Sequence, residues 1–131
     1  MRWAGYISIK RGDRDSHRRS LEQCGQVIAD KRGVLLFPEG TRSTLGHPKT
    51  FKKGAFKLAS QHQVPVVPIV LRGAGTLMRK ATLCPNPGTV QLTVLPPTYC
   101  GENETTQEFT TRVENLIKDQ HAKLTTPVSS R

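Results

Sequence analysis

Residues 34–43 read Val34-Leu35-Leu36-Phe37-Pro38-Glu39-Gly40-Thr41-Arg42-Ser43, and this stretch decides the predicted fold. Its first four residues are apolar without interruption, which is typical of a strand that is covered on both faces. Pro38 has no N–H to donate to a strand ladder, so the strand should end there. Gly40 suits a tight turn. The stretch therefore predicts a buried strand that leads directly into an exposed polar loop.

Extended and helical patterns alternate on both sides of this stretch. The predicted elements are strands at 6–9, 34–37, 66–71 and 90–94, with helices after Asp13, from about 51 to 63, and after Thr105. Alternation of this kind predicts an α/β domain with a mixed, largely parallel sheet flanked by helices. We expect the domain to cover residues 1–124, with a polar tail at 125–131.

Short polar signals and apolar spacing mark the helices. Asp13, Asp15 or Ser16 would cap the first helix, and Gly33 would end it. Thr105 and Glu108 form a possible capping box for the last helix. The expected core positions are Leu21, Cys24, Val27, Ile28, Phe56, Ala59, Phe109, Val113, Leu116 and Ile117. Val90, Leu92 and Val94 alternate as in a strand with one buried face.

The charge is unevenly distributed. The chain holds 20 Lys and Arg against 10 Asp and Glu, and residues 40–101 hold no acidic residue at all. Such a stretch creates a positive field that attracts anions. Phosphate-bearing small molecules, anionic lipid surfaces and nucleic acid are all open as partners, although one Trp and two Tyr offer few stacking platforms for bases.

Two classes of function are disfavoured. The longest apolar run, residues 64–71, is much shorter than the ~20 residues of a membrane-spanning helix. The three cysteines and four histidines lack metal-ligand spacing, so we expect neither a metal site nor a disulfide framework.

Candidate binding residues follow the predicted strands. Ligands of α/β sheets bind at the carboxyl ends of the strands, and Arg11, Arg42 and Arg72 each follow one strand, so all three could meet one anion. Arg42 offers a planar donor fork that matches phosphate. The lysines at 49, 52, 53 and 57 form either a solvated face or a surface for acidic headgroups.

Glu39 needs a separate explanation, because it is the only acidic residue between Asp30 and Glu102. It could hold Arg42 or Arg11 in position, or accept a hydrogen bond from a substrate hydroxyl. The plain alternative is a surface turn with a Glu–Arg pair worth a few tenths of a kcal/mol.

Four segments resemble conserved parts of the glycerolipid acyltransferases, the family that includes 1-acylglycerol-3-phosphate acyltransferase; three are signature blocks and one is a helix. Residues 37–43 resemble the third block, residues 5–11 the second, and residues 64–69 the fourth, while residues 53–57 match the helix that usually follows the third block. Their order and spacing agree with the family over roughly residues 1–122, and the bacterial and plastid enzymes are the most similar in pattern.

The resemblance implies transfer of an acyl group from acyl-CoA or acyl carrier protein to lysophosphatidic acid, giving phosphatidic acid in phospholipid biosynthesis at a membrane. It implies no metal, prosthetic cofactor or nucleic acid. It assigns Arg11, Glu39, Gly40, Thr41 and Arg42 to the acceptor phosphate. It assigns Val66, Pro68 and Ile69 to the acyl side of the site or to its structural support.

The sequence departs from the family in one respect. The family's general base is the histidine of a His-x-x-x-x-Asp block, and no histidine here has Asp five positions later. We therefore expect no catalytic residue in this chain, which would be the acceptor-binding portion of a longer enzyme whose base and membrane anchor lie upstream. A non-catalytic lysophospholipid-binding protein and a basic nucleic-acid module are the alternatives.

Overall fold

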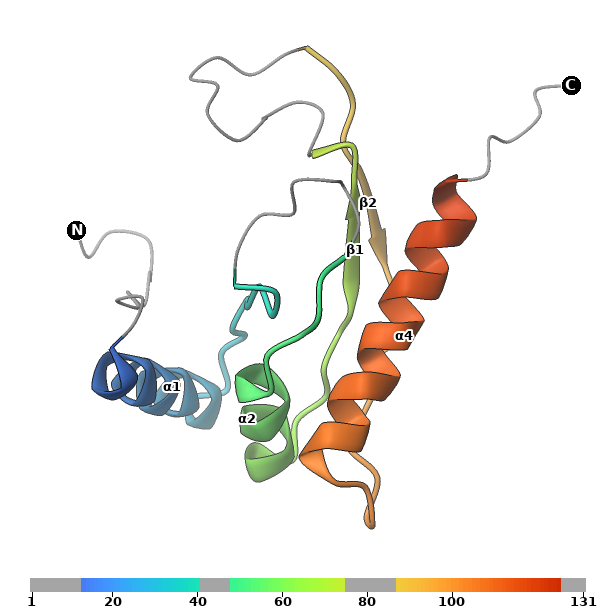
Figure 1. Cartoon of the computed structure of the whole chain (residues 1–131). Helices are drawn as coiled ribbons and strands as arrows, with labels where there is room; N and C mark the ends of the chain where they lie inside the picture. Colours follow the sequence, from blue (N-terminus) through green and yellow to red (C-terminus); the bar gives the residue numbers. More distant parts are fainter. Residues whose placement is uncertain (1–12, 41–47, 75–86, 126–131) are drawn as a thin grey trace, which may run out of the picture.

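The computed structural model describes residues 13–40, 48–74 and 87–125. Its elements are α1 (Arg14–Ala29), α2 (Gly54–His62), β1 (Ile69–Arg72), β2 (Gln91–Val94) and α4 (Thr106–Thr125). α2 lies between α1 and α4, and α4 runs alongside the two strands (Figure 1). The strand expected at 6–9 lies outside the described residues. None of the described helices combines the length and the hydropathy that crossing a membrane requires.

The predicted caps of the first and last helices are confirmed in detail, whereas α2 begins at Gly54, three residues later than expected. Oδ1 of Asp13 accepts hydrogen bonds from the N–H groups of Asp15 and Ser16, at 3.0 and 3.2 Å, and so caps α1. At the start of α4, the Glu108 carboxylate accepts from the N–H of Thr105 at 2.8 Å. The Glu108 N–H in turn donates to Oγ1 of Thr105 at 3.2 Å, which completes the capping box.

The predicted end of α1 is wrong. The helix ends at Ala29, and the left-handed residue behind it is Lys31, with φ of 58°, rather than Gly33. The N–H groups of Lys31 and Arg32 donate to the carbonyls of Ile28 and Val27, so the helix is already closed before Gly33 is reached.

The two described strands form one antiparallel pair. Ile69 lies opposite Val94 and Leu71 opposite Leu92, and an isolated bridge joins Val66 to Thr98 further along. An antiparallel pair is compatible with the predicted mixed sheet, but the largely parallel character expected of it is not seen among the described strands. Two parallel strands need a crossover connection, usually a helix. The sequence predicted such a crossover in α2, between a strand at residues 34–37 and β1.

Residues 34–37 form no strand, which contradicts the prediction. Leu35 and Phe37 are each 70% exposed. No described strand pairs with this segment, and only Val34 and Leu36 of its apolar side chains are half-buried. An uninterrupted apolar run predicts burial only when neighbours exist on both sides.

The core lies where α2 and α4 meet. Phe51, Phe56, Ala59, Phe109 and Val113 form one buried cluster, and the rings of Phe56 and Phe109 contact edge to face at 5.5 Å between centroids. Four of these residues were expected from the helical spacing. Cys24 of α1 is also buried as expected, whereas Leu21, Val27, Ile28, Leu116 and Ile117 are only half-buried.

One face of the sheet is covered and the other is open. Val70 is 2% exposed, and β1 packs against α4 on that side. The opposite face is apolar and exposed; its side chains are Ile69, Leu71, Leu92 and Val94. The prediction that Val90, Leu92 and Val94 face the core is therefore wrong, because α4 packs against the other side of the sheet.

Candidate functional site

The loop that was expected to bind an anion begins with a tight turn. The Gly40 N–H donates to the Phe37 carbonyl at 3.1 Å, and Gly40 adopts φ of +67°, which only glycine adopts readily. A Cβ at Gly40 would lie 3.0 Å from Nζ of Lys52. Gly40 is therefore required by the positive φ of the turn, since the exposed Lys52 side chain can move aside. Its own N–H is used within the turn.

Glu39 is half-buried and bonded to main chain rather than to a described cation. Its Oε2 accepts from the Lys49 N–H at 3.1 Å, and the Pro38 carbonyl accepts from the Lys52 N–H at 2.9 Å. These two bonds tie residues 38–39 to residues 49–52. The partners expected for Glu39, Arg11 and Arg42, lie outside the described residues, as does Thr41.

The segment that leads into α2 is also held by α4. Oε2 of Glu114 accepts from the Phe51 N–H at 2.8 Å, and Oε1 pairs with Lys118 one turn along α4. Burial would raise the pKa of Glu114, but the bonds from Lys118 and the Phe51 N–H outweigh burial and keep the pKa below its usual value. The side chain that anchors this segment comes from 63 residues away in sequence. The sequence reasoning missed it.

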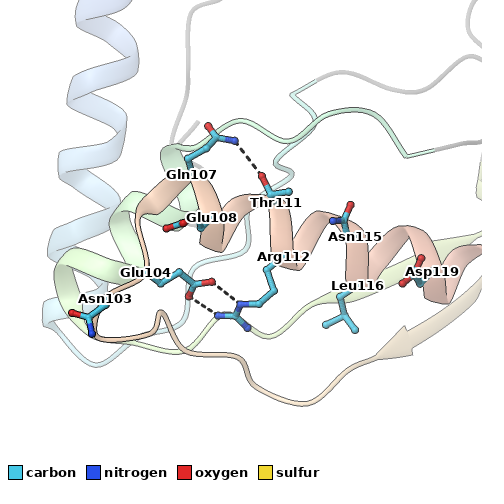
Figure 2. Close-up of a pocket in the computed structure, with 9 residues that line it drawn as sticks. All are labelled: Asn103, Glu104, Gln107, Glu108, Thr111, Arg112, Asn115, Leu116 and Asp119. Atoms are coloured by element: carbon cyan, nitrogen blue, oxygen red, sulfur yellow. Dashed lines mark hydrogen bonds and ion pairs between the residues drawn. The ribbon is translucent and has the colours of Figure 1, made fainter.

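Figure 2 shows a second candidate region, a shallow hollow along α4 where Glu104 and Arg112 face each other. Nε and Nη2 of Arg112 each donate to one carboxylate oxygen of Glu104 at 2.7 Å, and Nη2 also donates to the Tyr99 carbonyl. The hydrogen bonds from Arg112 are the main cause that lowers the pKa of Glu104 to about 2. Because these groups satisfy one another, we interpret the pair as a structural clamp between α4 and residues 99–104.

The three residues expected on the acyl side mostly support the fold. Val66 exchanges backbone hydrogen bonds with Thr98 at 2.8 and 2.9 Å and packs against the core cluster. Pro68 is buried, and its carbonyl accepts from the Leu95 N–H. Only Ile69 is substantially exposed, on the open face of the sheet.

Four lysines lie on or just before α2 and are all exposed, and of these Lys49 and Lys52 contact the turn; the four are Lys49, Lys52, Lys53 and Lys57. No ion pair joins Lys52, Lys53 or Lys57 to a carboxylate within the described ranges. Arg72, the third arginine of the predicted anion site, is half-buried at the end of β1. In the described part of the chain, no group of three His, Cys, Asp or Glu could hold a metal ion.

Comparison with known proteins decides the family. The model of the family described as "Acyltransferase" matches residues 1–72, which is more than half of the chain and includes Arg11 and the whole of residues 37–43. The chain belongs to the acyltransferase family. The resemblance seen in the sequence is thereby confirmed.

Similar members of the family carry related names. A 1-acyl-sn-glycerol-3-phosphate acyltransferase of Chlamydomonas reinhardtii is 44% identical over 71% of this chain and 29% of its own length. The alpha enzyme of that name from Mus musculus is 46% identical over 72% of this chain and 34% of its own length. A chloroplastic relative from Brassica napus is 39% identical over 76% of this chain and 29% of its own length. The chain thus spans about a third of the length of these acyltransferases.

A solved acyltransferase has a similar fold. The 1-acyl-sn-glycerophosphate (LPA) acyltransferase PlsC from Thermotoga maritima matches 86% of this chain with a TM-score of 0.78 and 28% identity. The match covers 46% of that enzyme. This likeness, together with the mixture of helices and strands, supports the α/β class that was predicted from the sequence.

Proposed function

We propose that this chain supplies the part of a lysophosphatidate acyltransferase that holds the glycerol phosphate of the acceptor. The observation that carries the proposal is the family match over residues 1–72, because it includes both the segment of Arg11 and the turn at residues 37–40. In the complete reaction, acyl-CoA or acyl carrier protein gives its acyl group to the free hydroxyl of lysophosphatidate, and phosphatidate forms.

The proposed acceptor site combines arginine forks with a preformed turn. Arg42 and Arg11 would grip the phosphate through paired N–H donors, which lysine cannot reproduce. The Thr41 hydroxyl adds a donor. Gly40 and Glu39 contribute through the turn, whose main chain is already held by the bonds at Phe37 and Lys49. Positioning of an acceptor in this way can lower the barrier by several kcal/mol.

We propose that these 131 residues bind the acceptor but do not transfer the acyl group. A base must take the proton of the acceptor hydroxyl, and the His-x-x-x-x-Asp pattern that serves this purpose in the family does not occur in the sequence. The exposed lysines around the start of α2 would favour contact with an anionic membrane surface, where lysophosphatidate resides. Val66 and Pro68 would support the acyl side of the site through the fold.

The test is binding of the purified chain to neutral phosphatidylcholine vesicles that contain lysophosphatidate, compared with vesicles that contain lysophosphatidylcholine. We expect preference for lysophosphatidate and a loss of at least about tenfold in Arg42→Lys, because the bidentate bonds to phosphate are removed. Arg18→Lys, at an exposed position of α1, is the matched control because it makes the same exchange outside the proposed site. Equal binding to both lipids, or full affinity in Arg42→Lys, would refute the acceptor site.

A second arm tests the proposed lack of transfer. The chain is incubated with acyl-CoA and lysophosphatidate, and phosphatidate is measured. We expect none to form. Formation of phosphatidate by these residues alone would show that another group replaces the histidine base.

A further inference from the structure

The segment that leads into α2 is held by hydrogen-bond acceptors that lie far away in the sequence. Residues 49–52 belong to neither helix nor strand, yet three of their backbone N–H groups donate to distant groups. Lys49 donates to the Glu39 carboxylate at 3.1 Å, Phe51 to Glu114 at 2.8 Å, and Lys52 to the Pro38 carbonyl at 2.9 Å. Two of these three bonds join the segment to the residues that precede the loop.

We propose that Glu39 is a positioning residue, whose carboxylate closes the base of the loop that carries Thr41 and Arg42 and does not itself touch the acceptor. The inference deepens the proposed function and rests on it for what the loop binds. The bond from Lys49 spans ten residues, so it fixes where the chain returns after Arg42. Holding the two ends at residues 39 and 49 before the ligand binds reduces the entropic cost of binding.

Electrostatics favours this role over direct contact with the acceptor. A carboxylate placed against a phosphate repels it, and the surrounding stretch, residues 40–101, contains no other acidic residue. The cost of one carboxylate in a basic site is offset if the carboxylate holds a backbone donor through a charge-assisted hydrogen bond. The half-buried position of Glu39 and its bond to Lys49 fit this purpose.

Glu39→Gln removes the charge of Glu39 but keeps a hydrogen-bond acceptor. This variant therefore distinguishes loop closure from a role that needs the negative charge. If Glu39 holds an arginine, its negative charge is what matters, and Glu39→Gln should be as harmful as Glu39→Ala. If Glu39 accepts only from the acceptor hydroxyl, Glu39→Ala should weaken binding but leave exchange at Lys49 unchanged. If Glu39 closes the loop, the amide oxygen of Gln can still accept from the Lys49 N–H. A neutral hydrogen bond is weaker than a charged one by about 1 kcal/mol, so Glu39→Gln should lose only a few fold.

The experiment measures two quantities on the same 131-residue chain, with folding checked by circular dichroism. Amide hydrogen exchange at Lys49, followed by NMR, reports loop closure, and binding to lysophosphatidate vesicles reports function. For Glu39→Ala we expect exchange at Lys49 to accelerate and binding to weaken, each about tenfold or more. For Glu39→Gln we expect changes of only a few fold in both. Glu102→Ala, at an exposed acid outside the site, should change neither.

Two results would overturn the proposal. One is an unchanged exchange rate at Lys49 in Glu39→Ala. The other is a Glu39→Gln variant that keeps Lys49 protected but loses binding as completely as Glu39→Ala. Failure of the wild-type chain to bind lysophosphatidate would refute the proposed function instead, and the exchange rates would still decide whether Glu39 closes the loop.

Discussion

Removing the carboxylate of Glu114 should loosen the junction between α4 and the segment that leads into α2. Glu114→Ala deletes the acceptor of the Phe51 N–H, and Phe51 is itself only 7% exposed. The N–H would then be left without a partner in a site that water reaches poorly. The same change also removes the ion pair with Lys118.

The expected cost follows from these contacts. A buried N–H that loses its acceptor costs about 1–3 kcal/mol. The partly buried pair with Lys118 adds at least the roughly 0.3–0.5 kcal/mol of an i,i+4 pair on a helix surface. Alanine returns a few tenths of a kcal/mol as the better helix former. We therefore expect Glu114→Ala to lower the free energy of unfolding by about 2 kcal/mol. Glu114→Gln, which keeps an acceptor for Phe51, should cost about 1 kcal/mol.

Urea denaturation followed by circular dichroism measures this difference, with the slope against denaturant concentration expected to stay unchanged. Asn115→Ala, at the exposed neighbouring position of α4, is the matched control and should stay within about 0.5 kcal/mol of the wild type. If Glu114→Ala and Asn115→Ala are equally stable, the bond from Phe51 does not hold this junction and the reasoning is wrong.

Three further predictions concern stability and the surface. Folding lowers the pKa of three carboxyl groups, those of Glu104, Glu108 and Glu114. Their contribution to the free energy of unfolding is therefore present above the unfolded pKa near 4.5 and is lost as the pH falls. Unfolding measured between pH 5 and 2 should show this loss, since the pKa of Glu104 is about 2, and Glu104→Gln should reduce the slope. Phe109→Ala should cost about 3–5 kcal/mol by urea denaturation, because the ring is fully buried against Phe56, and Phe109→Leu should cost clearly less. The open apolar face of the sheet should bind the dye ANS, and Leu92→Thr should lower the fluorescence with little change in stability; an unchanged signal would contradict that assignment.

The features that the sequence predicted well are those whose partners are near in the chain. Asp13 caps α1 through residues two and three positions away, and the Thr105–Glu108 box is equally local. The turn at Gly40 follows from the demand for positive φ. Phe56 and Phe109 were identified from helical spacing, since each helix buries one stripe.

The features that the sequence predicted badly depend on which other element packs against a segment in the folded chain. The apolar run at 34–37 carries no information on whether a neighbouring strand covers it, and here Leu35 and Phe37 are exposed. The alternation at Leu92 and Val94 shows that the two faces of the strand differ, but α4 determines which face is buried. The bonds of Glu39 and Glu114 to backbone N–H groups were missed, because no side-chain pattern marks a main-chain donor as their partner.

The most direct test of the central claim follows the arginine side-chain Nε–Hε signals of the isotope-labelled chain by NMR while short-chain lysophosphatidate is added. The account predicts that the signals of Arg11 and Arg42 shift together, with one dissociation constant, along with the backbone amide of Thr41. It would be contradicted if only one of the two arginines responds, or if both respond equally to lysophosphatidylcholine.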